Sequence, residues 1–319
     1  MRRSRIFLYG LFTGLALCLG ACGQNDKVND NNQVTEEPIP AKEDVTSVNN
    51  ETTENSSAAG SGKTEGNPQT DNGNNVDSSD NTEINTSITL TFTEDTDTVT
   101  AEDGTELYTN ICNYPTVEID GNPKATELIN ADIMERVDAF KNSSEIQEAA
   151  KENYELYPEY FNSYGDWLFI GSPRADMDVI SLGMVYESYS GGAHGNLVNV
   201  AVNYDPHTGD ILSFSDLSDD VEQFRINTLE YNQKTAATEE YAERLFTTDS
   251  ITNGELENVL YEEDKWYFSD EGLVFISDPY MLGPWAAGTI EFTIPYEELV
   301  ELGMKEIYSR PGPRAEIIN

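Results

Sequence analysis

Residues 177–210 read MDVISLGMVYESYSGGAHGNLVNVAVNYDPHTGD, two strand-like runs separated by a glycine-rich break. In the first run every second residue is large and apolar: Ile180, Leu182, Met184 and Tyr186. Such alternation is typical of a β-strand with one buried face. The second run begins near residue 196 and ends in Asp-Pro-His-Thr-Gly-Asp, in which proline and glycine favour a tight turn. We therefore expect the first run, together with DWLFIGS at 166–172, to form the centre of a sheet, and the second run to form a hairpin with ILSFSDL at 211–217 around the Asp-Pro-x-x-Gly turn.

Further strand-like and helix-like segments flank these runs. Strands are expected at 86–94, 106–119, 166–172 and 289–295, and a hairpin at 265–278 with its turn at 270–272. Helices are expected at 122–140, after Ser215 or Asp216, at 238–246 and at 296–302. Asn122 is expected to cap the first helix, with Pro123 at its first position, and Pro115 to interrupt its strand. Because βαβ regularity is absent, the expected fold class is α+β, with mixed or antiparallel sheets, packed helices and two intertwined subdomains.

The N-terminus has the pattern of an export signal. Three arginines within the first five residues precede an apolar run at 6–18, which is shorter than the roughly 20 residues that span a bilayer. Such a segment indicates a signal peptide that is removed, here residues 1–21. Leu-Gly-Ala-Cys at 19–22 resembles the lipobox of bacterial lipoproteins, which implies cleavage before Cys22 and lipidation of its thiol. The alternative is an ordinary exported protein with a chance cysteine at this position.

Lipidation would determine where the chain resides. A diacylated Cys22 supplies the more than one acyl chain that stable anchoring needs, so we expect the extracytoplasmic face of a bacterial membrane. Residues 22–86 consist mostly of Asn, Asp, Glu, Ser, Thr and Gly, which predicts a disordered acidic linker. The folded part is expected to comprise a first subdomain at 87–190 and a second at 191–308, followed by a tail at 309–319.

Acidity is concentrated in the folded part. The formal charge is −41, to which the N-terminal arginines contribute +3, residues 23–86 contribute −10 and residues 87–319 contribute −34. Such a field repels nucleic acid and anionic lipid and attracts cations and basic proteins, so no nucleic-acid partner is expected. Solubility, or life at high salt, is an alternative reason for the acidity. Cys112 is the only cysteine after Cys22, so no internal disulfide is expected.

Three segments carry a resemblance to a known family: YSGGAHGN at 189–196, NYDPHTGDILSFSDL at 203–217 and WYFSDEGLVFISDPYMLGPWAAGTIEFTIPYEEL at 266–299. They resemble a pair of domains of unknown function found in the outer part of the lysozyme-sensing anti-sigma-V factor and ahead of the catalytic domain of some peptidoglycan deacetylases. The resemblance implies the same fold and binding to lysozyme or to cell-wall glycan. A lipobox and a linker stand where the anti-sigma relatives have a sigma-binding segment and a membrane span, and no catalytic domain is expected, so neither activity is implied.

Apolar and aromatic residues gather in DPYMLGPWAAG, residues 278–288, between two expected strands. Exposed aromatic side chains are typical of interface hot spots, and the resemblance implies that this loop lies near the partner. The expected partner-binding residues, two of them around the glycine-rich break, are Tyr189, His194, Tyr280, Met281, Leu282, Pro284 and Trp285. The alternatives are a loop folded back over the core and, for His194, a turn histidine bonded to the backbone.

No catalytic, metal or cofactor site is expected. His194, the distant His207 and Cys112 do not supply the three or four ligands of a zinc site, and the acidic loops do not fit the calcium-loop pattern. No pair of carboxylates with a glycosidase separation can be assigned. We therefore predict a lipid-anchored binding protein without enzymatic activity, which recognises a lysozyme-like basic protein or peptidoglycan. The alternatives are a cell-wall hydrolase or deacetylase with His194 in its site, and a structural envelope lipoprotein.

Overall fold

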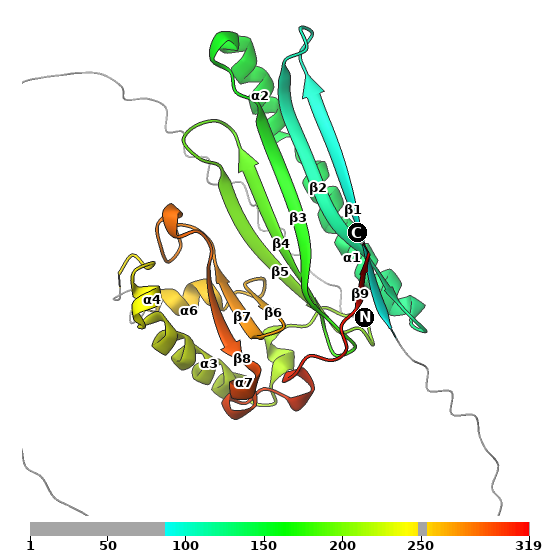
Figure 1. The fold of residues 1–319 in the computed structure, drawn as a ribbon, viewed down its shortest axis with the longest axis vertical. Coiled ribbons are helices and arrows are strands. Elements are labelled where there is room, and N and C mark those ends of the chain that lie inside the picture. The colour runs from blue at the N-terminus through cyan, green and yellow to red at the C-terminus, as the bar shows by residue number, and fades with distance from the viewer. Residues whose placement is uncertain (1–86, 248–253, 319) are drawn as a thin grey trace, which may run out of the picture. The chain divides into compact units, whose positions relative to one another are not determined.

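The computed structural model describes residues 87–247 and 254–318, all within one compact unit of the chain. The predicted signal peptide (1–21), the predicted lipidation residue Cys22 and the predicted linker (22–86) lie outside the described residues. The fold is α+β, as predicted, with a mixed six-stranded sheet, a three-stranded antiparallel sheet and packed helices (Figure 1). Within the described ranges, every helix is too short or too polar to span a membrane.

The larger sheet has six strands. In spatial order these are β5 (Asn196–Tyr204), β4 (Ile180–Tyr189), β3 (Tyr164–Ala175), β2 (Glu106–Ile119), β1 (Ile88–Thr100) and β9 (Glu316–Ile318). Neighbours are antiparallel except for the parallel pairs β2/β3 and β1/β9. Residues 166–172 and 177–190 contribute to β3 and β4, which pair inside the sheet, as predicted, and β5 pairs with β4 at the edge. The hairpin expected between β5 and residues 211–217 is reduced to a single bridge between Tyr204 and Ile211, because residues 214–217 form a 3-10 turn.

Helices cover one face of the six-stranded sheet. Helix α1 (Pro123–Lys141) begins with Pro123 and is capped by Asn122, whose side chain accepts a hydrogen bond from the Ala125 amide, as predicted. Its buried stripe packs on the alternate apolar residues of β4 in one core, which includes Ile129, Ile133, Val137, Leu182 and Met184. Each such buried side chain contributes about 1.5–3 kcal/mol relative to an exposed position. Helix α2 (Glu145–Leu156) and the 3-10 turn η1 (Pro158–Tyr160) follow.

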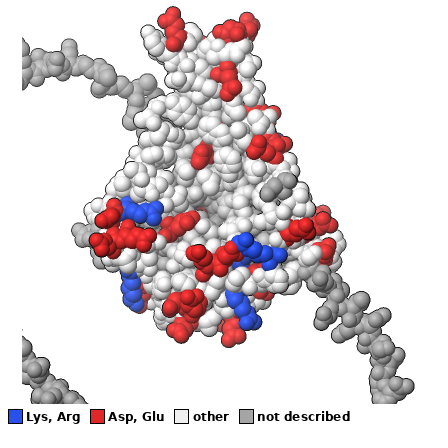
Figure 2. Space-filling view, viewed as in Figure 1, with Lys and Arg blue, Asp and Glu red and all other residues white. Residues whose placement is uncertain are grey.

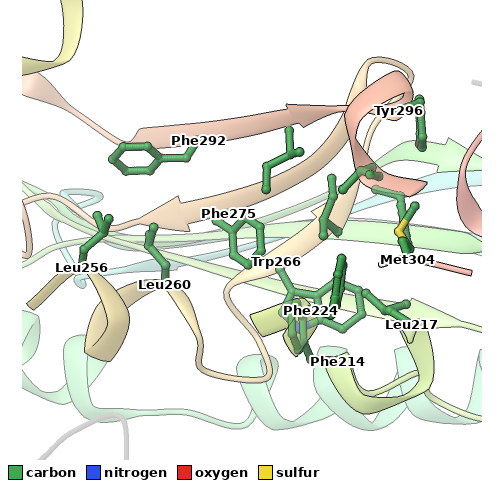
Figure 3. Close-up of a cluster of buried hydrophobic side chains, with 14 of the residues drawn as sticks. Phe214, Leu217, Phe224, Leu256, Leu260, Trp266, Phe275, Phe292, Tyr296 and Met304 are labelled. Atoms are coloured by element: carbon green, nitrogen blue, oxygen red, sulfur yellow. The ribbon is translucent and has the colours of Figure 1, made fainter. Parts of the chain in front are cut away.

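The smaller sheet forms the centre of a second, helix-covered core. Its strands are β6 (Trp266–Phe268), β7 (Gly272–Ser277) and β8 (Ile290–Pro295). Around it lie η2 (Phe214–Leu217), α3 (Val221–Ala236), α4 (Glu239–Ala242), α6 (Glu255–Leu260), η3 (Trp285–Ala287), α7 (Tyr296–Leu302) and η4 (Glu306–Tyr308). Figure 3 shows aromatic side chains from η2, α3, β6, β7 and β8 converging on this core. The predicted β6–β7 hairpin and the passage from β8 into α7 at Pro295 are confirmed.

Strand β6 lies against the face of the larger sheet that α1 does not cover. The Phe268 amide donates to the Ser181 hydroxyl, and the Asn203 side-chain amide donates to the Trp266 carbonyl. The Ala201 amide donates to the Asp264 carbonyl. This cover explains why residues 199–204 of β5 are buried on both faces although β5 is an edge strand. The two cores are therefore joined by hydrogen bonds that are themselves buried.

Two local predictions were wrong for physical reasons. Strand β2 runs through Pro115 without interruption, because its pairing with β3 ends at Asn113 and leaves one side of β2 unpaired at the proline. The helix after the 205–210 turn is not capped by Ser215 or Asp216. These residues belong to η2, and Asp220 caps α3 by accepting from the Gln223 amide.

Candidate functional site

Two loops from different sheets bring three predicted site residues together. His194 lies in the β4–β5 loop (190–195), and Tyr280 and Trp285 lie in the β7–β8 loop (278–289). The His194 and Trp285 rings stack at a centroid distance of 4.3 Å and an interplanar angle of 13°. The Tyr280 ring lies 6.0 Å from each of the other two, and its hydroxyl is 3.2 Å from Nε2 of His194. We call these three side chains the ring cluster.

Backbone conformation shapes both loops. Gly191 and Gly192 have φ of +92° and +97°, angles that favour glycine. Gly195 is required for a different reason, since a Cβ there would lie 2.5 Å from the Ser188 carbonyl oxygen. Among the described residues other than glycine, only Tyr280 has a positive φ, +70°. An L-residue in this region of φ carries a strain of about 1–2 kcal/mol. Contacts elsewhere in the loop must therefore offset the backbone strain of Tyr280.

A buried ion pair anchors the β7–β8 loop to β5. The Lys265 ammonium donates to Asp278 at 2.7 Å, and their side chains are only 11% and 14% exposed. Asp278 also accepts from the backbone and side-chain amides of Asn199 at 2.7 and 2.8 Å. The Asn199 side chain reaches the Thr289 hydroxyl as well. At the far end of the loop, Arg244 donates to the carbonyls of Ala287 and Thr289, so both ends of the loop are fixed.

The loop combines exposed and buried apolar residues. Tyr280 is 55% exposed, Met281 and Pro284 are also exposed, and Trp285 is half-buried. Leu282 is 1% exposed and belongs to the core of the smaller sheet. The loop is thus pinned to the core by one residue and presents the others outward.

Tyr189 is not part of the ring cluster. It lies at the end of β4, where its ring packs edge-on against Tyr164 at 6.3 Å and its hydroxyl donates to the Gly192 carbonyl. Tyr164 stacks in turn on Phe161. Burial raises the pKa of the Tyr164 hydroxyl. Tyr189 therefore stabilises the β4–β5 loop through its hydrogen bond to Gly192. The sequence alone did not show that Tyr189 lies outside the ring cluster.

Both ring nitrogens of His194 have partners. Nδ1 lies 2.7 Å from the Gly195 carbonyl oxygen, and a carbonyl can only accept, so Nδ1 carries the proton. In the neutral ring Nε2 is then an acceptor, and the Tyr280 hydroxyl donates a hydrogen bond to it. The hydrogen bond of His194 to the backbone, one alternative that the sequence allows, thus exists together with the aromatic contacts.

A cleft that the sequence did not single out lies between the two sheets. It has a volume of about 470 Å³ and is bounded by β3, β4 and β5 on one side and β6, β7 and β8 on the other. We call it the inter-sheet cleft. The Tyr267 hydroxyl donates to Glu291 at 2.9 Å at its edge, and burial, with the Glu291 charge adding to it, raises the pKa of Tyr267 well above its usual range. Tyr267 therefore stays a neutral donor.

The described ranges, 87–247 and 254–318, hold no group of three or more His, Cys, Asp or Glu side chains arranged to bind a metal ion. Cys112 is buried and free, and burial raises the pKa of its thiol to about 11. The thiol is therefore protonated at neutral pH and is not an activated nucleophile.

Two protein families match the chain. Residues 101–197 match the family model described as "Deacetylase PdaC", and residues 216–297 match "Protein of unknown function (DUF3298)". The chain thus belongs to the class of α+β proteins that carry a PdaC domain followed by a DUF3298 domain, the pair also found in anti-sigma-V-like factors, and the resemblance noted from the sequence is confirmed. His194 falls within the first match, and Tyr280 and Trp285 fall within the second, so the ring cluster joins the two domains.

Solved structures of similar proteins include two DUF3298 family members. One, from Bacteroides fragilis NCTC 9343, is 17% identical, covers 69% of this chain and 94% of its own, and has a TM-score of 0.49. The other, from Pseudomonas aeruginosa PAO1, is 14% identical, covers 70% of this chain and 96% of its own, and has a TM-score of 0.43. A search of curated proteins finds no match.

Proposed function

We propose that this PdaC–DUF3298 protein is a lipid-anchored, extracytoplasmic binding protein that recognises a basic, lysozyme-like protein through the ring cluster. One observation carries the proposal: an exposed aromatic cluster, built from both domains, on a strongly acidic chain. The domain pair adds support, because it also occurs in anti-sigma-V-like factors.

The ring cluster has the properties of an interface hot spot. Tyr and Trp dominate binding energy at protein interfaces, where they fill well-packed, desolvated positions. Stacking on His194 and the anchored loop hold Trp285 and Tyr280 in one geometry before a partner arrives. Such preorganisation lowers the conformational entropy lost on binding. Exposed Tyr280 and Met281 then contribute about 25 cal/mol for each Å² of apolar surface that a partner buries.

The charge of the chain selects a basic partner. Residues 87–319 carry a formal charge of −34, and the face in Figure 2 shows acidic side chains around a largely uncharged centre. Complementary charge raises association rates and disfavours acidic competitors. An uncharged centre among mostly acidic side chains therefore fits a basic protein better than a nucleic acid or an anionic glycan.

We further propose that binding is not catalytic. Acid–base catalysis by His194 needs a ring nitrogen within reach of substrate, whereas both nitrogens are engaged, one with Gly195 and one with Tyr280. The test is an assay of peptidoglycan fragments for hydrolysis and for deacetylation. Turnover by the wild-type protein that His194→Ala removes would establish the enzyme instead.

The binding proposal is tested with immobilised lysozyme and with purified peptidoglycan at physiological salt. Wild type should be retained on lysozyme, and the double variant Tyr280→Ala/Trp285→Ala should lose at least tenfold in affinity, since each hot-spot residue contributes at least 2 kcal/mol in typical interfaces. Tyr160→Ala is the matched control, because this 82%-exposed tyrosine lies in η1, outside both loops. No retention of wild type on lysozyme would reject the proposal, whatever is retained on peptidoglycan.

The anchor is tested separately. Mass spectrometry of the protein isolated from its native membrane should find acyl chains and a diacylglyceryl group on an N-terminal Cys22. Cys22→Ala should move the protein from the membrane fraction into the soluble fraction. Cross-linking in cells that captures only a membrane partner would favour the structural envelope lipoprotein.

A further inference from the structure

We propose that the inter-sheet cleft is a second binding site, which holds a pyranose sugar ring without an acidic group. The cleft is separate from the ring cluster, and this second site does not depend on the protein partner proposed above. The floor of the cleft contains two glycines that no packing constraint requires.

Gly171 and Gly183 form the floor of the cleft. They face each other directly across β3 and β4. A Cβ built on either residue meets no described heavy atom within 4 Å, and neither residue has a positive φ. Glycine in a strand interior costs about 0.5–1 kcal/mol relative to alanine, so the pair weakens the sheet with no gain in packing or backbone freedom.

A glycine within a strand often marks a place where a ligand approaches the backbone closely. The register between β3 and β4 shifts directly after Gly171, and such bulges are over-represented beside binding sites. Two adjacent residues without side chains leave a flat backbone surface. A flat surface of this kind fits the face of a ring rather than a branched side chain.

The walls supply apolar contact beside this floor. Phe169 lies two residues before Gly171, on the same face of β3, and its side chain is 40% exposed. Val185 in β4 lies opposite Phe169 in β3, and Ile276 lines the cleft from β7. The volume of about 470 Å³ falls within the range of about 300–1,000 Å³ typical of small-molecule sites, and such sites favour boundaries between domains.

The polar groups of the cleft determine the chemical class of the ligand. The Glu291 carboxylate accepts one hydrogen bond from Tyr267 and has further lone pairs for hydroxyl donors. Asn199 and Ser172 line the same cleft; the Asn199 amide donates to Asp278 and Thr289 and the Ser172 hydroxyl donates to the Ser181 carbonyl, so their side-chain oxygens remain as acceptors for ligand hydroxyls. A sugar ring satisfies both requirements, because its C–H face is apolar and its edge carries hydroxyls. A phosphate or a uronic acid would meet Glu291 and the acidic surface as like charges.

The probe is the tetrasaccharide of N-acetylglucosamine, measured by calorimetry and by ligand-observed NMR. It should bind wild type, whereas a tetrasaccharide of galacturonic acid, which carries carboxylates, should not. Gly183→Val should weaken binding at least tenfold, because the new side chain occupies the cleft. The melting temperature of this variant should not fall, since valine favours strands and meets free space.

Further variants test the wall of the cleft and separate the cleft from the ring cluster. Phe169→Leu, which removes the ring but not the apolar bulk, should also weaken binding, and Tyr160→Leu should leave it unchanged. The ring-cluster double variant should retain sugar binding, so loss of lysozyme binding there concerns the proposed function alone. Failure of the tetrasaccharide to bind wild type, or equal binding by Gly183→Val, would overturn the assignment.

Discussion

At the scale of single residues, Tyr280 combines a strained backbone with an exposed ring. Its φ of +70° is easily adopted by glycine and disfavoured for alanine. We expect Tyr280→Gly to be about 1 kcal/mol more stable than Tyr280→Ala by urea unfolding, because only glycine relieves the strain. Both variants lack the ring and should lose partner binding to the same extent. An alanine variant as stable as the glycine variant would show that the loop does not keep this backbone conformation in solution.

Lys265 determines whether Asp278 is a stable buried anion. Lys265→Met leaves the carboxylate with only the two Asn199 amides as donors. Removing one partner of a buried ion pair typically costs about 3–5 kcal/mol, and we expect a loss near the lower limit because both side chains keep some exposure. The double variant Lys265→Met/Asp278→Asn should lose less than the two single variants together. Additive losses in unfolding free energy would contradict the coupling.

The Asp166 carboxyl makes the free energy of unfolding depend on pH. Burial raises the pKa of its carboxyl above the ordinary 3.8, although the Tyr108 hydroxyl donates to it at 2.9 Å. The folded state therefore holds this proton more tightly than the unfolded state, and the resulting stabilisation is complete below pH 3.8. It is lost as the pH rises through the higher folded-state value.

Asp166→Asn isolates this contribution from the other acidic groups. The difference in unfolding free energy between wild type and variant should fall as the pH rises from 3.8, and should become constant once the folded carboxyl is ionised. Unfolding in denaturant at a series of pH values measures it. A difference that grows with pH would mean that the carboxylate, not the acid, is favoured in the fold.

Among the secondary-structure elements, the spacing of apolar residues predicted those strands and helix ends that depend on neighbouring residues in the sequence. The alternation at 86–94 and 177–190 gave β1 and β4, and the Asn122-Pro123 pair gave the start of α1. Parallel pairing of β2 with β3 and of β1 with β9 was not predictable, because strands far apart in sequence leave no local signal of their register. For the same reason the sequence did not predict that β5 is an edge strand or that β6 covers one of its faces.

The candidate site was predictable residue by residue but not as a geometry. His194 and Trp285 were chosen for their chemistry, yet 91 positions separate them and only the tertiary fold stacks their rings. The inter-sheet cleft had a weaker signal, an isolated glycine within each of two strand patterns. Those glycines became informative once the register placed Gly171 opposite Gly183.

At the scale of the whole molecule, Arg174 joins the two cores to the C-terminal segment. Its guanidinium is fully buried, pairs with Asp176 at 2.8 Å and donates to the Tyr296 hydroxyl and to the carbonyls of Tyr308 and Arg310. Asp176 in turn accepts from the Gly312 amide. This contact precedes β9, whose addition to β1 is only three residues long, so the buried pair attaches the segment next to a short strand.

We expect Arg174→Met to lower the unfolding free energy by about 3–5 kcal/mol, because it leaves Asp176 as an unpaired buried charge. Amide hydrogen exchange at Glu316–Ile318 should rise more than exchange in β4. Arg314→Met is the control, since the Arg314–Asp270 pair lies at the surface and contributes little. Equal protection of Glu316–Ile318 in wild type and in Arg174→Met would show that β9 is held independently of the buried pair.

The charge of the whole molecule should act on the rate of encounter with a basic protein rather than on the lifetime of the complex. The ring cluster is aromatic and contains no carboxylate, whereas the charge of −34 is spread over residues 87–319. Raising the ionic strength from about 0.01 M to about 0.15 M shortens the screening length from about 30 Å to about 8 Å. The association rate with lysozyme should therefore fall at least tenfold, and the dissociation rate should change by less than about twofold. Tyr280→Ala should show the opposite pattern, a faster dissociation with an unchanged salt dependence of association. If salt accelerated dissociation instead, ion pairs within the contact, and not the rings, would hold the complex together.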